Sequence, residues 1–157
     1  MTNAAQHAWD MMDNLDFCFL VAERAEGMRA RPMSSIVKQD EDMVYFLSNA
    51  TSEQLADIAA LPNVLLNYGD GSRRFVSVAA TAKLSTDREL IKRLWNPGAQ
   101  TFWPEGAEKA DVVVICATPH AAEYWDGPLG IVTLAKMAVS LATGSKPDMG
   151  DNERVAL

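Results

Sequence analysis

The feature that most constrains the fold is a series of short strand-like segments along this chain of 157 residues. Each is rich in aromatic, β-branched or other apolar residues, and turn-forming residues separate most of them. The segments are Phe17–Ala22, the two limbs of a hairpin between Met28 and Asn49, Val64–Tyr68, Arg73–Ser85, Asp111–Ala117 and Ala121–Asp126. Short turns join most of them and helices only one or two, which favours antiparallel pairing over parallel βαβ winding. We therefore predict one mainly β (α+β) domain over residues 1–157, a small closed β-barrel with helices packed outside it.

Apolar residues recur at helical spacing in four further places. We expect helices over residues 3–13, from Thr51 or Ser52 up to Pro62, over Arg88–Trp95, and from Leu129 to Leu141. The run Asn96-Pro97-Gly98 is expected to terminate the third helix, and Gly144 the last. Residues 121–126 are expected to form a hairpin with residues 111–117, and the polar residues 145–157 to form a loosely ordered tail.

The hairpin between residues 28 and 49 brings together groups that can bind an anion. Its first limb carries Arg29 and Arg31 beside hydroxyl side chains, and its second limb ends in Ser48 and runs straight into a helix start. Arginine offers a fixed fork of donors, and the amides at a helix N-terminus point outward without partners. These parts together predict an anion site. The alternative is that the two arginines form the solvent face of an ordinary hairpin, since exposed arginines are the default.

The balance of charge limits the partners of the chain. With 14 basic and 21 acidic residues the net charge is −7, and surfaces for nucleic acid or anionic membranes need a basic footprint, so we expect neither partner. No apolar run is long enough to span a membrane, and the N-terminus lacks the basic-then-apolar order of a signal peptide. Cys18 and Cys116 each lie in an apolar strand-like run, which favours buried thiols over a disulfide and predicts a cytoplasmic protein.

The residues that usually carry catalysis are few. His7 and His120 are the only histidines, one near the N-terminus and one expected in a turn between strands, and no Cys-x-x-Cys or His-Glu-x-x-His motif occurs. Neither cysteine has a plausible histidine partner close in sequence. The run Gly69-Asp70-Gly71 is more typical of a turn than of a phosphate-binding loop. We therefore predict no metal site and assign no catalytic acid, base or nucleophile.

Aromatic residues cluster in the second half of the chain, where Trp95, Phe102, Trp103, Tyr124 and Trp125 occur. They can fill the core between barrel and helices. The alternative is a stacking wall for a planar ring or a subunit interface, because aromatic residues concentrate at such surfaces.

The order of several motifs resembles a known family. The motifs are Arg-Ala-Arg-Pro-Met (29–33), Val-Tyr-Phe-Leu-Ser (44–48), Asn-Val-Leu-Leu-Asn-Tyr (63–68), Val-Ser-Val-Ala-Ala-Thr-Ala (76–82), Leu-Trp-Asn-Pro (94–97), Phe-Trp-Pro-Glu-Gly (102–106), Ala-Glu-Tyr-Trp-Asp (122–126) and the run from Leu141 to Asn152. Taken together they resemble the general stress protein 26 group of the pyridoxamine 5′-phosphate oxidase-like, FMN-binding split-barrel superfamily. The resemblance covers nearly the whole chain.

This resemblance implies a six-stranded antiparallel split β-barrel with peripheral helices, and a homodimer with one FMN in each of two clefts at the subunit interface. Arg31 would grip the phosphate, and the isoalloxazine ring would lie along the backbone from Pro32 to Ser35. Ser48 and the turn onto the following helix would add contacts, and the strand from Arg74 to Ser77 would come near. The candidate cofactor-binding residues are Arg29, Arg31, Pro32, Met33, Ser34, Ser48, Asn49, Ser52, Gln54, Arg74, Val76, Ser77 and Trp125.

One position departs from the family pattern. The family commonly has Ser-x-Lys or a basic pair at the start of the helix, whereas this chain has Ser52-Glu53-Gln54. Loss of one charge-assisted contact to a phosphate removes ~1.5–3 kcal/mol, roughly a tenfold to hundredfold loss in affinity. Arg29, Arg31 or Arg74 could compensate for it.

Three hypotheses follow for the function. The first is a flavoprotein with redox or stress-related activity and without true pyridoxamine phosphate oxidase activity, in which FMN, FAD or a deazaflavin is the flavin. The second is a binding or sensor module of the same fold that has lost tight FMN binding, with Glu53 and Gln54 as its signature. The third is a structural dimer without a ligand.

Overall fold

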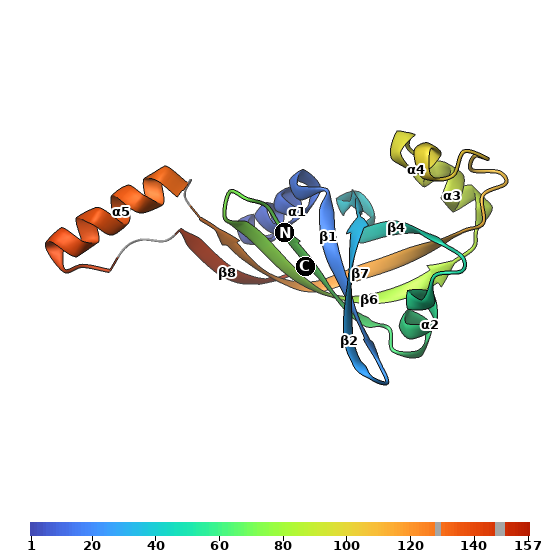
Figure 1. Ribbon diagram of the computed structural model, residues 1–157, viewed down its shortest axis with the longest axis horizontal. Helices are drawn as coiled ribbons and strands as arrows, with labels where there is room; N and C mark the ends of the chain where they lie inside the picture. Colours follow the sequence, from blue (N-terminus) through green and yellow to red (C-terminus); the bar gives the residue numbers. More distant parts are fainter. Residues whose placement is uncertain (128–129, 147–149) are drawn as a thin grey trace.

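The structure is a computed structural model that describes residues 1–127, 130–146 and 150–157, with the side chains of 130–134 left undescribed. Its elements, in chain order, are α1 (Asn3–Leu15), β1 (Phe17–Arg24), β2 (Gly27–Ser34), β3 (Ile36–Lys38), the 3₁₀ turn η1 (Gln39–Glu41), β4 (Met43–Asn49), α2 (Glu53–Ala60), β5 (Asn63–Gly69), β6 (Arg74–Ser85), α3 (Arg88–Leu94), α4 (Pro97–Phe102), β7 (Val112–Asp126), α5 (Gly130–Thr143) and β8 (Asp151–Ala156). Figure 1 shows a strongly twisted sheet with α2 at one side, α3 and α4 together at one end, and α5 projecting from the other end.

The described strands form one antiparallel sheet in the order β2-β1-β5-β6-β7-β4-β3, and β8 adds to β7. Both ends of this path belong to one segment of chain, because β2 and β3 are separated only by Ser35. The amide and the hydroxyl of Ser35 both donate to the Asp16 carbonyl oxygen, at 2.8 and 2.9 Å, and these bonds hold the bend. The sheet therefore curls back on itself without hydrogen-bonded closure. The predicted mainly antiparallel split barrel with peripheral helices is confirmed, whereas the closed barrel expected from the strand pattern is wrong, because β2 and β3 at the two ends of the sheet do not pair.

Seven strand-like segments were expected from the sequence, and the sheet has eight strands within the described residues. The bend at Ser35 divides one of these segments into β2 and β3, the last two segments form the single strand β7, and β8 is additional. This bend also limits the hairpin expected between residues 28 and 49. Only Ile36–Lys38 pairs with β4, whereas β2 pairs with β1 in the register Leu20↔Arg31.

The core lies inside the curved sheet and under α1. Alternate residues of the strands point inward, as the two-residue period of a strand requires; Leu20 on β1 and Phe46 on β4 are fully buried. Helix α1 closes the core with Trp9 and Met12, and its predicted amphipathic character is confirmed. A second cluster, which includes Ile91, joins α3 to the other face of β4 and β7.

The hairpin predicted between residues 111–117 and 121–126 is wrong, because β7 is a single strand of 15 residues. It pairs with β6 along its length, and the register shifts where Ala79 faces Ala121 and Ala80 faces Pro119. Proline has no N–H to donate to a neighbouring strand, and an irregularity of this kind accommodates it. His120 therefore lies within β7 and not in a turn between strands.

The predicted loose tail is wrong for its last part, since β8 pairs with β7 from Asp126↔Asp151 to Ala121↔Ala156. The hydroxyl of Tyr124 donates to Glu153 at 3.0 Å and adds a side-chain contact to this pairing. The last helix is confirmed over Gly130–Thr143, with Gly144 at φ 70° after its end. Its predicted start at Leu129 lies outside the described residues.

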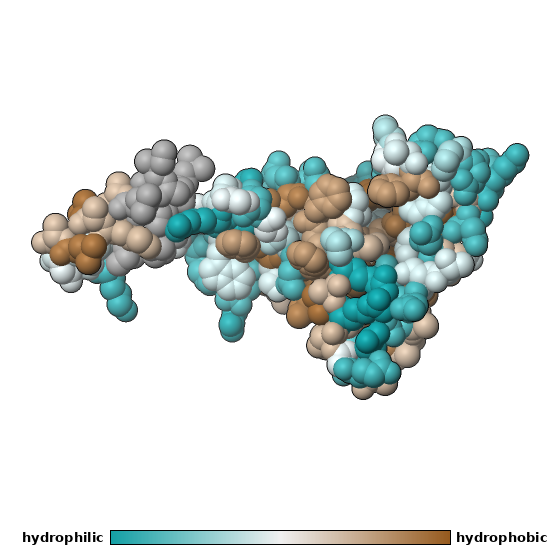
Figure 2. All heavy atoms as spheres, viewed as in Figure 1, coloured by the Kyte–Doolittle hydropathy of each residue, from teal (hydrophilic) through white to brown (hydrophobic). Residues whose placement is uncertain are grey.

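Helix α5 stands apart from the barrel in Figure 1. Figure 2 shows hydrophobic residues near the free end of this helix and along the middle of the molecule, with polar residues concentrated around α2 and the α3–α4 end. Leu141 on α5 is 88% exposed. Within the described part of the chain, none of the helices combines the length and hydrophobicity that a membrane span requires.

Candidate functional site

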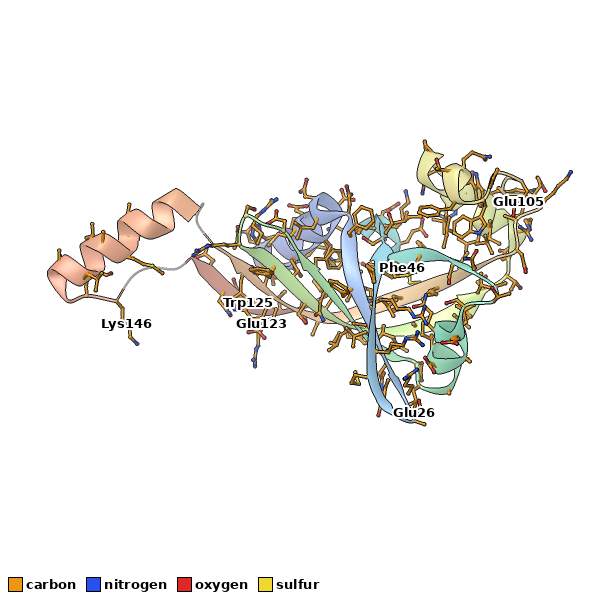
Figure 3. All side chains as sticks on the ribbon, viewed as in Figure 1. Glu26, Phe46, Glu105, Glu123, Trp125 and Lys146 are labelled. Atoms are coloured by element: carbon orange, nitrogen blue, oxygen red, sulfur yellow. The ribbon has the colours of Figure 1, made fainter. Side chains whose placement is uncertain are left out.

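A cleft of about 530 Å³ lies between the bent β2–β3 segment, the end of β4, the start of α2 and the helix α4. Its size falls in the range of small-molecule and cofactor pockets. In Figure 3 this region lies between the labelled Phe46 on β4 and the labelled Glu105 beyond α4. The lining residues are Phe17, Arg31, Pro32, Met33, Ser34, Ile36, Leu47, Ser48, Asn49, Ser52, Gln54, Asn96, Gly98, Ala99, Phe102 and Trp103.

Arg31 is the one charged residue among those that line the cleft. It lies on β2, and its Nη2 is 3.7 Å from the Glu53 carboxylate. Its Nε is buried and has no hydrogen-bond partner among the described residues. A buried donor without a partner costs about 1–3 kcal/mol, so an acceptor atom of a ligand would be bound favourably there.

Gln54 and Ser48 form the floor of the cleft next to Arg31. Both side chains are buried, Gln54 to 4% exposed and Ser48 to 5%. The Gln54 Nε2 donates weakly to Ser48 Oγ at 3.4 Å and to Met33 Sδ at 3.6 Å, whereas its Oε1 has no partner among the described residues. The cleft therefore holds an unpaired donor and an unpaired acceptor close to its cationic end.

The start of α2 borders the same end of the cleft. Ser52 is the N-cap residue, as predicted, but its side chain makes no capping hydrogen bond. The amides in the first turn of a helix have no partners within the helix and carry a partial positive charge. This helix start therefore adds to the attraction of an anion near Arg31.

An aromatic wall formed by Phe102 and Trp103 faces this polar end. Their ring centroids are 6.0 Å apart, and Trp103 is also 6.0 Å from Trp95. The indole Nε1 of Trp103 donates to Asn49 Oδ1 at 2.7 Å, which fixes the wall to the end of β4. Phe102 remains 80% exposed, so its ring is available for stacking. Of the five clustered aromatic residues, Phe102 and Trp103 line the cleft.

The two arginines of β2 have different environments. Arg31 reaches the cleft, whereas Arg29 lies beside it and donates from Nη1 to Glu53 Oε2 at 2.7 Å. This hydrogen bond and the charges of both arginines hold the pKa of Glu53 below its usual value. Glu53 is therefore an anion close to the position at which a ligand phosphate would lie.

Most of the predicted site residues are brought together by the fold. Arg31, Pro32, Met33, Ser34, Ser48, Asn49, Ser52 and Gln54 all line the cleft. These residues lie within about two dozen positions of one another, where β3–β4 pairing and the turn into α2 determine their positions. The arginine and hydroxyl side chains of the hairpin were grouped from the sequence itself, and the family resemblance added Pro32, Met33, Ser52 and Gln54.

Four of the predicted cofactor-binding residues lie away from the cleft within a single chain. Arg74 is bound to Asp70 at 2.6 Å, Val76 is buried in the core, and Ser77 donates to Asn67 at 2.7 Å. Val113 pairs with Ser48 near one end of β7, and Trp125 lies near the other end. Along an extended strand, Val113 and Trp125 are about 40 Å apart. These four residues do not line the cleft of a single chain.

The α4 side of the cleft was missed by the sequence analysis. Asn96-Pro97-Gly98 was expected only to stop a helix, but Asn96 caps α4, accepting from the Ala99 amide at 2.9 Å, and Pro97 is the first helical residue. Proline at the first position of a helix after an asparagine cap is a recognised start signal. That signal could have revealed α4, and with it Gly98 and Ala99 as lining residues.

Groups that could perform acid–base or thiol chemistry lie outside the cleft. Burial raises the pKa of Cys18 to about 12 and also raises that of the half-buried Cys116, and both thiols are free. His7 contacts Asp126 at 2.9 Å, and His120 contacts Thr81 at 2.6 Å. Among the described residues no cluster of three or more possible metal ligands occurs.

The fold is a split barrel, and one cleft in it brings together an arginine, the start of a helix and two aromatic rings. The family profile described as "Pyridoxamine 5′-phosphate oxidase like" matches residues 3–148. The chain belongs to this family. No curated protein matches the sequence.

Solved structures share the fold at low sequence identity. A protein from Jannaschia sp. CCS1 whose description names general stress protein 26 has a TM-score of 0.80 at 24% identity, with 100% of each chain covered. The general stress FMN/FAD binding protein from Xanthomonas citri has a TM-score of 0.67 at 20% identity, covering 76% of this chain and 86% of its own. A pyridoxamine 5′-phosphate oxidase-related FMN binding protein from Nostoc punctiforme PCC 73102 has a TM-score of 0.62 at 14% identity, covering 98% and 95%.

Proposed function

We propose that this protein binds FMN in the cleft between β2, β4, α2 and α4, and that it is a homodimeric flavoprotein of the general stress type with a redox or stress-related role. The observation that carries the proposal is the buried Nε of Arg31, which has no hydrogen-bond partner among the described residues and lies in a cleft that Phe102 and Trp103 also line. Structural relatives described as FMN-binding support the choice of ligand. When bound, the flavin supplies the redox chemistry.

The phosphate is proposed to lie against Arg31 and the first turn of α2. Arg31 would donate through its unpaired Nε, and the helix start would add its outward-pointing amides. Ser48 and Gln54 would donate or accept at the same end, since both are buried and make only long hydrogen bonds. The polar end of the cleft thus matches a phosphate ester.

The isoalloxazine ring is proposed to lie along Pro32 to Ser34 and against the aromatic wall of Phe102 and Trp103. These residues line the same cleft, and Asn49 holds Trp103 in place through its indole N–H. Aromatic rings favour offset or edge-to-face contact with another planar system. The apolar end of the cleft thus matches a planar ring.

The homodimer is proposed from the outer face of the sheet. Exposed large hydrophobic residues occur on neighbouring strands of this face, at Phe19, Leu65, Phe75 and Trp125. Next to them is a hollow of about 410 Å³, lined mainly by small and apolar residues of β5 to β8. Contiguous exposed apolar surface of this kind marks an interaction site.

Phe17 connects this outer face with the cleft, because it lines the cleft and is 64% exposed next to Phe19 on β1. A second copy on the outer face would therefore come close to the cleft of the first. We propose that Arg74, Ser77 and Trp125 approach the flavin only in this way, from the second copy. This arrangement would account for their separation from the cleft within one chain.

True pyridoxamine phosphate oxidase activity is not proposed. A substrate with its own phosphate would need a second cationic site beside the flavin, and Arg31 is the one charged residue lining the cleft. We also propose that the protein works in the cytoplasm, and the free thiols of Cys18 and Cys116 support a reducing compartment.

The proposal is tested by titrating purified, flavin-stripped protein with FMN and with riboflavin while following the quenching of flavin fluorescence. We expect FMN to bind more tightly than riboflavin, and Arg31→Gln to weaken FMN binding by roughly tenfold to hundredfold with little effect on riboflavin. Arg24→Gln is the matched control, since Arg24 pairs with Glu26 away from the cleft. Equal FMN affinity in Arg31→Gln and the native protein would contradict the proposal.

A second candidate function rests on Gln54. This buried, neutral residue occupies the position where the family commonly has a cation, and Glu53 beside it adds a negative charge. The alternative is therefore a binding or sensor module that no longer holds FMN tightly. If the native protein ignores FMN while Gln54→Lys binds it, this alternative replaces the first.

A further inference from the structure

Glu53 contacts both arginines of β2. Its Oε2 is 2.7 Å from Arg29 Nη1 and 3.7 Å from Arg31 Nη2, so one carboxylate lies between two guanidinium groups. Arg29 and Arg31 are alternate residues of one strand and therefore project to the same side of it. We call Arg29 and Arg31 the arginine fork; the carboxylate of Glu53 is the anion bound between its two guanidinium groups.

The carboxylate of Glu53 is held loosely. The side chain is 76% exposed, and its contacts are these two arginines. Ion pairs at such exposed positions contribute little to stability, because water solvates both charges when they separate. The side chain can therefore swing away from the arginines without disturbing the first turn of α2.

We propose that Glu53 is a built-in competitor that lowers the affinity of this cleft for phosphate-bearing ligands and must leave the arginine fork when a phosphate enters. This inference rests on the proposed function and concerns the regulation of the same site. A phosphate at Arg31 would compete with the Glu53 carboxylate for the guanidinium of Arg31, and it would meet the charge of Glu53 at close range. Removal of that charge favours the phosphate in both respects.

The charge of Glu53 should change the affinity for phosphorylated ligands and leave the affinity for unphosphorylated ligands unchanged. Glu53 contacts Arg31 but is not among the residues that line the cleft, so its charge would act on the phosphate and not on the flavin ring. Glu53→Gln keeps the size and helix compatibility of the side chain and removes its charge. We expect about a tenfold gain in affinity for FMN and no gain for riboflavin.

Glu26 offers a matched control. It is as exposed as Glu53 and pairs with Arg24 at 3.4 Å in the turn between β1 and β2. Figure 3 shows Glu26 at the tip of this hairpin, and it does not line the cleft. Glu26→Gln makes the same change in net charge on the same hairpin, so it measures the effect of a charge removed outside the fork of Arg29 and Arg31.

The experiment titrates the native protein, Glu53→Gln and Glu26→Gln with FMN, riboflavin and inorganic pyrophosphate. Fluorescence quenching follows the flavins, and the shift in thermal midpoint follows pyrophosphate. The inference expects tighter binding of FMN and pyrophosphate by Glu53→Gln alone, with riboflavin unchanged.

The outcomes separate the inference from the proposed function. If FMN binds all three proteins equally, the inference is overturned and the flavin proposal stands. If no flavin binds but pyrophosphate stabilises Glu53→Gln more than the other two, the flavin proposal fails and the inference stands for a different phosphorylated ligand. If Glu26→Gln matches Glu53→Gln, overall charge is responsible and the inference is overturned.

Discussion

The indole N–H of Trp103 donates a hydrogen bond to Asn49 Oδ1 at 2.7 Å, and these residues are 54 positions apart in the chain. The bond joins the end of β4 to the residue that follows α4, so it holds the aromatic wall at a fixed distance from the strand that carries Ser48. The width of the cleft depends on this contact.

We expect this bond to be detectable as an energetic coupling. Asn49→Ala and Trp103→Phe should each lower the free energy of unfolding, and the double variant should lose about 1 kcal/mol less than the sum of the two. Urea denaturation of the four proteins measures the coupling. Additive effects would mean that Asn49 and Trp103 contribute independently.

The same pair should affect ligand binding. Asn49→Ala frees the wall, so we expect weaker FMN binding, whereas Phe102→Ala removes an exposed ring without loosening Trp103. Phe102→Ala should therefore leave the unfolding free energy nearly unchanged while also weakening FMN binding. Fluorescence titration and urea denaturation of the same preparations separate the two effects. A large loss of stability in Phe102→Ala would contradict this assignment.

The contrast between the two ends of the cleft shows what the sequence can predict. Arg31 and Ser48 lie in the hairpin whose arginines and hydroxyls predicted an anion site, and the family resemblance added Gln54 from the helix that follows. Trp103 reaches Asn49 only through the packing of α3 and α4 on the barrel, and no local pattern specifies that contact.

Two errors in the fold have a similar origin. A turn was expected between residues 117 and 121, but β7 continues through Pro119, which the partner strand β6 accommodates through a shift in register. Asp151–Ala156 are polar enough to suggest a loose tail, yet an available edge on β7 pairs with them. Both outcomes depend on a neighbouring strand that lies far away in sequence.

Gln54→Lys tests whether the departure from the family pattern weakens the site. Lysine would bring a charge to a position that is 4% exposed and next to Arg31, so we expect the unliganded protein to lose about 1–3 kcal/mol of stability. FMN should bind roughly tenfold to hundredfold more tightly, because the phosphate gains a charge-assisted contact. Saturating FMN should then restore the stability.

Gln54→Met provides the control for this substitution. It has a similar volume, removes the unpaired Oε1 and adds no charge, so we expect stability equal to or above that of the native protein and no gain in FMN affinity. Thermal denaturation with and without FMN compares the variants. A gain in FMN affinity with methionine would show that relief of the unpaired oxygen, and not the charge, is responsible.

Cys18 should make the fold sensitive to alkaline pH. Burial raises its thiol pKa to about 12 from an ordinary value of 9.0, against a smaller opposing effect of the Tyr68 hydroxyl. Above pH 9.0 the unfolded chain releases this proton and the folded chain retains it, so stability is complete below the unfolded pKa and falls as the pH rises toward the folded one. The expected slope is about 1.4 kcal/mol per pH unit.

Cys18→Ala should lose stability at neutral pH through the cavity it leaves, but it should show a shallower alkaline loss than the native protein. Cys116→Ala is the control, since that thiol is only half-buried. Urea denaturation at about pH 8 and about pH 10 gives the difference. Parallel alkaline losses in the native protein and Cys18→Ala would assign the effect to another group.

The proposed dimer predicts that Phe75 is protected in solution. Phe75 is 47% exposed in a single chain and faces Trp125 across β6 and β7. Phe75→Asp places a charge on this surface, so we expect the mass in solution to fall from twice the chain mass of 17.2 kDa to that of one chain. Sedimentation equilibrium measures this change. Phe102→Asp alters an exposed ring at the cleft and is the control, so this variant should remain dimeric. A native protein that is already monomeric would contradict the proposal that Trp125 and Arg74 come from a second copy.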